Sequence, residues 1–202
     1  MRPQTLLVFG AMVMLFACGQ GRSGETGAMP PLVDTSVQGG HGITETFIDT
    51  ATDNEVLLAL TDDLLTRLGN SPNAYATIMT WNKARRAVFV AWQLDLEVNN
   101  GGFNQFYYNP SGKFYPLVPE SLNYIGAPLL ADLARRANKT YEEQIDRIKK
   151  DQNGTPDGFS KSYKGNPLNE YDHAFYQLNK KEGLEKIIVD FVRVHKSAFV
   201  QW

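Results

Sequence analysis

The chain has 202 residues, of which 43% are hydrophobic and 21% are charged, a composition typical of one globular domain with a sizeable core. Its formal net charge of −2 is too small to indicate a nucleic-acid partner or a strongly acidic surface. The single cysteine, Cys18, excludes an internal disulfide framework, so the cellular compartment has to be inferred from targeting signals.

The N-terminus resembles the signal of a bacterial lipoprotein. Arg2 precedes an apolar run over residues 6–17, which is too short to span a bilayer comfortably but suits the core of a signal peptide. The run ends in Leu15-Phe16-Ala17-Cys18, which resembles a lipobox, so Cys18 is the predicted lipidation site and mature N-terminus. The alternative is a plain secretory peptide, or an N-terminal anchor with an incidental cysteine.

A flexible tether is expected to follow the cysteine. From Gly19 to about Glu45 the chain is rich in Gly, Ser, Thr and Pro and has few large apolar residues. Gly and Gln, rather than Asp, follow the cysteine, which by resemblance to bacterial sorting rules favours the outer membrane. We therefore predict a signal peptide over residues 1–17, a lipidated cysteine and tether over 18–50, and a folded domain over 51–202. The predicted location is the cell envelope, with attachment to the membrane through the lipid.

The folded part is predicted to be helical throughout. Leucines at the helical period indicate a first helix that is capped by Asp53 or Asn54 and stopped by Gly69 and Asn70. Ser71-Pro72 opens a second helical region. A long helix over Trp81 to Val98 is apolar nearly all round, which predicts a buried central position. Further helices are expected at Leu117–Tyr124, Pro128–Ala137, Tyr141–Lys150, Asn169–Asn179 and Gly183–Phe199, with Tyr141–Lys150 mostly solvated. The predicted fold is an all-α, single compact multi-helix domain around this central helix.

The central helix ends in a sharp corner, where two amides and two glycines interrupt the apolar run. Glycine can take the left-handed conformation that ends a helix and redirects the chain. The corner and the turn before it contain the candidate site residues, which serve either binding or structure. They are Asp95, Glu97, Asn99, Asn100, Gly101, Gly102, Phe103, Gln105 and Asn109.

Two interpretations of this corner stay open. At about 100° per residue, Asp95 falls within the apolar stripe and Glu97 points about opposite, so the two do not form an acid–base pair. In the structural interpretation, one of these carboxylates accepts hydrogen bonds from backbone N–H groups of Asn99 to Phe103. In the functional interpretation, Glu97, Asn100 and Gln105 line a recognition pocket.

A resemblance to a known family is carried by residues Glu97 to Asn109, by Ser111-Gly112 and by Leu122 to Ala127. These segments resemble the bacterial domains named after the C-terminal domain of the neisserial DNA-mimic protein, with a similarity from about Asn54 to Phe199. The resemblance implies an all-α fold and brings no catalytic residues, because most members have no assigned activity. Its named member is a dimer whose acidic surface imitates DNA phosphates and occupies a transcription factor.

The favoured functional hypothesis is a non-enzymatic module that binds an unknown protein in the envelope, with a homodimer as another form of assembly. It is motivated by the absence of catalytic, nucleotide or metal motifs and by an aromatic cluster, because aromatic residues often anchor interfaces. The cluster consists of Phe103, Phe106, Tyr107, Tyr108, Phe114 and Tyr115. The alternative for the first two of these rings is a place in the core.

Two other functions are weighed against this one. The first is an envelope hydrolase or small-ligand binder that uses the corner from Glu97 to Asn109. The second is a DNA mimic, which is least favoured because 22 acidic residues against 20 basic ones cannot reproduce an array of phosphates. No metal, cofactor or nucleic-acid partner is predicted. The oxygen-rich turn over residues 151–158 lacks the glutamate that closes a calcium loop.

Overall fold

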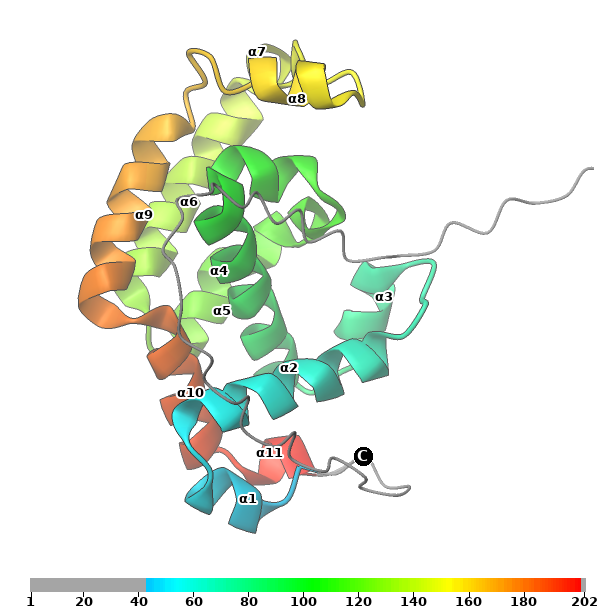
Figure 1. Cartoon of the computed structure of the whole chain (residues 1–202), viewed down its shortest axis with the longest axis vertical. Coiled ribbons are helices and arrows are strands. Elements are labelled where there is room, and N and C mark those ends of the chain that lie inside the picture. The colour runs from blue at the N-terminus through cyan, green and yellow to red at the C-terminus, as the bar shows by residue number, and fades with distance from the viewer. Residues whose placement is uncertain (1–42, 201–202) are drawn as a thin grey trace, which may run out of the picture. The chain divides into compact units, whose positions relative to one another are not determined.

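The structure, a computed structural model, describes residues 43–200 of the chain. The predicted signal peptide, Cys18 and the tether up to residue 42 lie outside the described residues. Over the described range the chain is helical and contains no strand, which confirms the predicted all-α class. The helices, shown in Figure 1, are α1 Glu45–Thr50, α2 Asp53–Leu68, α3 Ala74–Met79, α4 Lys83–Tyr108, the 3-10 helix η1 Pro110–Leu117, α5 Val118–Ile125, α6 Pro128–Glu143, α7 Ile145–Lys149, α8 Pro156–Lys161, α9 Asn169–Glu182, α10 Leu184–Val194 and α11 Ser197–Val200.

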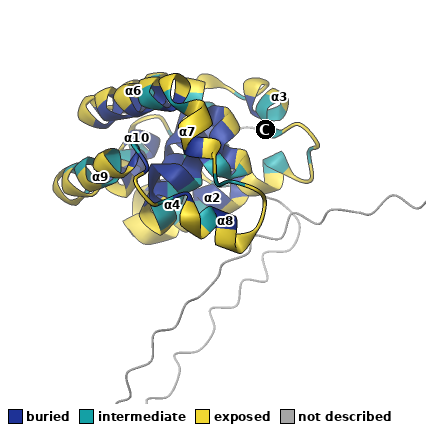
Figure 2. Cartoon of the chain, turned by 90° about the horizontal axis from the view of Figure 1, so that it is seen from above, coloured by how far each residue is buried: buried dark blue, intermediate teal, exposed yellow. Residues whose placement is uncertain are grey.

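Helix α4 is the central element of the domain, as predicted. It packs against α2, η1, α5, α9, α10 and α11, and its middle section is buried on every side. The segment from Ala87 to Ala91 has no residue that is more than 3% exposed. Figure 2 shows this buried helix inside a shell of helices whose outer faces are exposed. A helix that is apolar on every face is shielded from water only where other helices cover it on all sides.

The described fold begins before residue 51, where the domain was predicted to start. Helix α1 inserts Ile48, which is fully buried, into the core. Arg193 of α10 donates hydrogen bonds to the carbonyl oxygens of Ile48 and Ala51 and forms an ion pair with Asp53. The last six residues assigned to the tether are therefore part of the folded domain.

Helix α2 spans the predicted residues but has a different cap. Thr52 caps it, and Thr52 and Glu55 form a reciprocal capping box, so neither Asp53 nor Asn54 has that role. Among the leucines whose helical period predicted this helix, Leu60 and Leu64 are fully buried, whereas Leu65 is 46% exposed. Helix α3 likewise starts later than expected, with Asn73 as its cap.

Three predicted helix boundaries are wrong because tertiary contacts override local sequence. The central helix does not end at Val98 but continues, after a kink, to Tyr108. The expected solvated helix from Tyr141 to Lys150 is divided between α6 and α7, and Tyr141 is buried with its ring 4.0 Å from that of Tyr107. The final helix is interrupted at His195, whose ring stacks on Phe191 although the residue is exposed.

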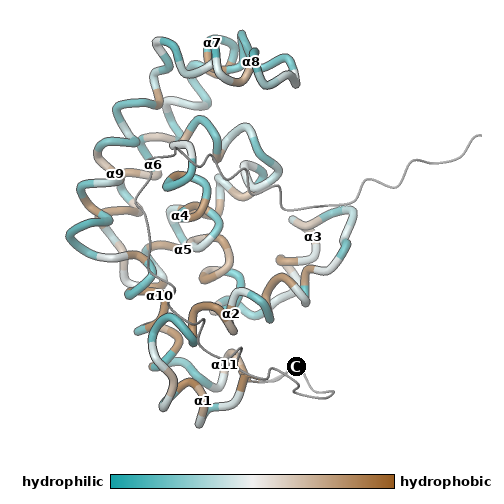
Figure 3. The backbone as a smooth tube through the Cα atoms, in the orientation of Figure 1, coloured by the Kyte–Doolittle hydropathy of each residue, from teal (hydrophilic) through white to brown (hydrophobic). Residues whose placement is uncertain are grey.

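The distribution of hydropathy agrees with this arrangement. Figure 3 shows hydrophilic residues over most of α7 and α8 and hydrophobic segments on α4 and α10, which lie closer to the core. Among residues 43–200, none of the helices combines the length and the apolar character needed to cross a membrane.

Candidate functional site: the glycine corner of α4

The corner of α4 is a kink at Gly101 and Gly102. Gly102 has a φ of 72° and a ψ of −178°, a backbone conformation that residues with a Cβ rarely adopt. Gly101, with a φ of −160° and a ψ of 28°, is also non-helical, but its φ lies outside the left-handed region. The helix resumes at Phe103, so the predicted corner redirects one helix instead of ending it.

The kink is held by Asp172 of α9, which the sequence did not single out. Its Oδ1 atom accepts a hydrogen bond of 2.7 Å from the backbone N–H of Phe103, which is a free donor at the start of the resumed helix. A Cβ atom on Gly102 would collide with this carboxylate. The glycine is therefore required both for the backbone angle and for the close approach of α9.

Two tyrosine hydroxyls donate hydrogen bonds to backbone carbonyl groups at the kink. Tyr163 donates to the oxygen of Gly101 at 2.7 Å, and Tyr176 of α9 donates to the oxygen of Val98 at 2.9 Å. Burial raises the pKa of Tyr163 to about 12, so its hydroxyl stays protonated and able to donate. The corner thus takes its hydrogen bonds from the chain between α8 and α9 and from α9 itself.

Glu97 links the two halves of the kinked helix α4 to each other and to η1 through hydrogen bonds. Its Oε2 atom accepts hydrogen bonds of 2.8 Å from the side-chain amides of Gln105 and Asn109, and its Oε1 atom accepts one of 2.8 Å from Ser111. Of the three side chains expected to line a recognition pocket, Gln105 donates its amide to Glu97, and Asn100 is exposed. The expectation that Glu97 or Asp95 binds the backbone N–H groups of the corner is wrong, since Asp172 has that role.

Asp95 lies on the other side of α4, against α9 and α10, and is only 4% exposed. Its Oδ1 atom accepts hydrogen bonds from the side-chain amides of Asn99, at 2.9 Å, and Asn179, at 2.8 Å. Burial raises the pKa of Asp95 to about 6, and the negative charge of Glu185 acts in the same direction, whereas the two amides oppose it.

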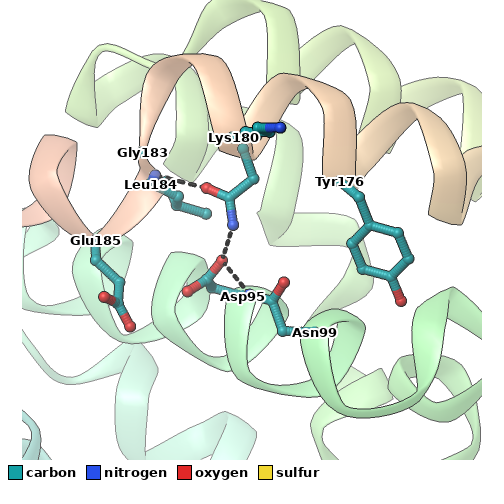
Figure 4. A pocket seen from close by; sticks show the side chains of 8 residues that line it. Asp95, Asn99, Tyr176, Lys180, Gly183, Leu184 and Glu185 are labelled. Atoms are coloured by element: carbon teal, nitrogen blue, oxygen red, sulfur yellow. Dashed lines mark hydrogen bonds between the residues drawn. The ribbon is translucent and has the colours of Figure 1, made fainter.

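Asp95 faces a pocket of about 440 Å³ that opens between α4, α9 and the start of α10 (Figure 4). The pocket is lined by Asp95, Asn99, Tyr176, Asn179, Lys180, Gly183, Leu184 and Glu185. Two of the predicted site residues, Asp95 and Asn99, thus meet residues that are more than 75 positions later in the chain. In the described part of the protein, no group of three or more His, Cys, Asp or Glu side chains is placed to hold a metal ion.

A second polar network surrounds Asn104, next to the corner, and was not predicted from the sequence. Asn104 is fully buried and donates to Ser162 at 2.8 Å, while its oxygen accepts from Asn166 at 2.9 Å and from Gln152 at 3.1 Å. Buried amides need such partners, because an unsatisfied one costs about 1–3 kcal/mol. The network connects the resumed half of α4 to the segment around α8.

A family comparison identifies the domain. The model described as DMP19-like protein matches residues 79–195, which is more than half of the chain. The chain belongs to the DMP19-like protein family. The resemblance predicted from the corner residues is thereby confirmed, and the match begins at the end of α3 and not near Asn54. The comparisons with curated proteins and with solved structures gave no match.

The aromatic cluster expected to anchor an interface belongs mainly to the core of this DMP19-like domain. Phe103, Phe106, Tyr107 and Phe114 are each at most 6% exposed. Tyr108 and Tyr115 are only partly buried, yet Tyr108 packs on Phe159 and Tyr115 on Tyr107. These rings stabilise the corner from inside, so they give no support to a protein-binding surface at this place.

The Gly102→Ala substitution is expected to destabilise the domain by about 3 kcal/mol, because it adds left-handed strain and displaces Asp172 from the Phe103 N–H. Gly126→Ala is the matched control: Gly126 has a φ of 95° but no atom within 4 Å of the added Cβ, so only the strain of about 1 kcal/mol applies. Urea unfolding of both variants measures the difference. Equal losses would contradict the proposed close contact.

The Asp95→Asn substitution is expected to change how stability depends on pH. Because the pKa of Asp95 is raised on folding, its contribution is present below about pH 4 and is lost as the pH rises through about 6. Asparagine keeps an acceptor for Asn99 and Asn179 but cannot ionise. Relative to the native chain, the variant should therefore gain about 2 kcal/mol between pH 4 and pH 7.

The measurement is urea unfolding at both pH values, with Asp190→Asn as the control. Asp190 is an exposed carboxylate of α10 paired with Lys186, and its replacement should change the difference between the two pH values by less than about 0.5 kcal/mol. An unchanged pH dependence in Asp95→Asn would show that the folded protein does not perturb this carboxylate.

Proposed function

We propose that this DMP19-like protein is a non-enzymatic interaction module that binds a protein partner in the bacterial cell envelope. The observation that supports this proposal is that the carboxylates at the corner accept their hydrogen bonds from the protein itself. Glu97 accepts three hydrogen bonds from side chains, and Asp172 accepts one from the backbone. A general base or nucleophile needs a lone pair directed at a substrate, whereas both oxygens of Glu97 and the Oδ1 atom of Asp172 are directed at the protein itself.

The envelope location rests on the N-terminal sequence. The apolar run and the lipobox-like residues before Cys18 support lipidation of this cysteine, and the residues after it favour the outer membrane. Acyl chains contribute about 0.8 kcal/mol per buried CH₂, and attachment by more than one chain is durable. A lipid anchor would hold the folded domain at a membrane surface, where its partner would be another envelope protein.

Binding of a small ligand is the second candidate function, and the pocket beside Asp95 favours it. A buried carboxylate with a raised pKa in a concave site is a common feature of ligand sites. A hydrolase at the Glu97 to Asn109 corner has weaker support, because Gln105, Asn109 and Ser111 occupy the Glu97 oxygens. DNA mimicry has the least support, because acidic and basic residues are nearly balanced, 22 against 20.

Replacing Glu97 by Gln tests whether the corner serves structure or chemistry. We expect a loss of about 2 kcal/mol in the free energy of unfolding, because glutamine offers one acceptor oxygen where three charge-assisted hydrogen bonds now end. Glu120→Gln, which removes only an exposed ion pair with Lys83, should cost less than about 1 kcal/mol. Unchanged stability in Glu97→Gln would contradict the structural role and favour a site that acts on a ligand.

The location is tested by fractionating cells that express the native chain or its Cys18→Ala variant. We expect the native chain to be acylated and recovered with the outer membrane, and the variant to be neither. If both are found in the cytoplasm without acylation, the lipoprotein interpretation is wrong. Partners should then be sought among DNA-binding proteins.

A further inference from the structure

In the pocket beside Asp95, one carboxylate oxygen has no hydrogen-bond donor among the described residues. Both amide donors, from Asn99 and Asn179, bind the Oδ1 atom, and no described residue donates to Oδ2. Figure 4 shows this second oxygen on the side of the carboxylate that faces Glu185. Asp95 as a whole is only 4% exposed and therefore poorly solvated, and Oδ2 is the part of its carboxylate that remains accessible from the pocket.

We propose that this pocket binds a cationic nitrogen group, an ammonium or a guanidinium. The inference rests on the proposed binding function, and it specifies the chemistry of what is bound. Such a group has two sources: a lysine or arginine side chain presented by the protein partner, or a small free amine. Both would place a positive charge next to the Asp95 carboxylate.

The acceptors around the pocket match this ligand. Asn99 turns its amide nitrogen to Asp95, which leaves its carbonyl oxygen for a ligand, and Glu185 adds an exposed carboxylate at the rim. Together with Oδ2 of Asp95 these groups provide an acceptor for each of the three donors of an ammonium group. Tyr176, which is 41% exposed, lines the same pocket, and its ring can contact the aliphatic part of the ligand.

Size and charge define the ligand further. A volume of about 440 Å³ accommodates one side chain or a small amine. The charged and titratable groups that line the pocket are Asp95 of α4, Tyr176 and Lys180 of α9 and Glu185 of α10. In the described structure Lys180 forms no ion pair with either carboxylate, so the negative charges are not neutralised from within the domain.

The pKa of Asp95 predicts how binding depends on pH. Only the ionised carboxylate attracts a cation, and the pKa of Asp95 in the unliganded pocket is about 6. By linkage a bound cation should lower the pKa of Asp95, and for a lowering of about one unit the affinity should fall about fivefold from pH 7 to pH 5.

The test uses the full chain and two kinds of probe. The first probe is butylammonium; the second is a tripeptide, acetylated and amidated at its ends, with lysine or arginine between two alanines. The same peptide with glutamine is the uncharged control. Calorimetry measures affinity, and carbon NMR of the carboxyl group measures the pKa of Asp95. We expect at least one cationic probe to bind and to lower this pKa by about one unit, and the glutamine peptide to do neither.

The variants separate the pocket from general charge attraction. Asp95→Asn should weaken binding of the cationic probe at least about tenfold, while Asp190→Asn, on the exposed face of α10, should leave it unchanged. Tighter binding of the lysine or arginine peptide than of butylammonium assigns the site to a protein side chain, and the reverse order assigns it to a free amine.

Three results would overturn the inference. The first is equal binding by the native chain and Asp95→Asn, and the second is binding by none of the cationic probes at millimolar concentration. The third is a rise of about one unit in the pKa of Asp95 in the unliganded Lys180→Gln variant, which would identify Lys180 as the cation of the pocket. Cross-linking of the native chain in intact cells keeps the two proposals distinct. An envelope adduct that persists in Asp95→Asn contradicts insertion of a partner's lysine or arginine into the pocket and leaves the interaction module intact, whereas no adduct with the native chain contradicts the interaction module.

Discussion

The contact between the backbone N–H of Phe103 and the Asp172 carboxylate is the constraint on which the rest of the domain depends. It exists because Gly102 has no Cβ and adopts a left-handed φ, so that a side chain of α9 can reach the backbone of α4. With α4 kinked at this point, Phe103 and Phe106 enter the core while Gln105 turns back to Glu97. One missing methyl group therefore decides the direction of the second half of the central helix.

The two carboxylates of the last turn before the kink have different roles because the helix turns about 200° between them. Glu97 faces the resumed half of its own helix and η1, where three donors use both of its oxygens. Asp95 faces α9 and α10, where two donors share one oxygen and leave the other free. The first arrangement satisfies the carboxylate within the protein, and the second leaves part of it for an external donor.

The sequence predicted those features that depend on neighbours along the chain. The apolar surface of residues 87–91 indicated a buried central helix, and the adjacent glycines indicated a corner. The partners of that corner could not be predicted, because Asp172, Tyr163 and Tyr176 lie 62 to 78 positions beyond the atoms they bind. Nothing in the local pattern distinguishes these residues from other polar residues on a helix surface. Similarly, the aromatic residues after the corner fit an interface and a core equally well until the packing of α6 and α9 is known.

The energetics of Asp95 favour a role outside folding. An asparagine at this position would still accept hydrogen bonds from Asn99 and Asn179, so the negative charge is not needed to hold α4 against α9. At neutral pH the charge instead destabilises the fold, because burial and Glu185 both raise the pKa of the carboxylate. Perturbed pKa values cluster at functional sites, where function can require a group that lowers stability. A cation that enters the pocket would remove the penalty and gain affinity from it, which connects the unfavourable charge of Asp95 to the binding function that we propose.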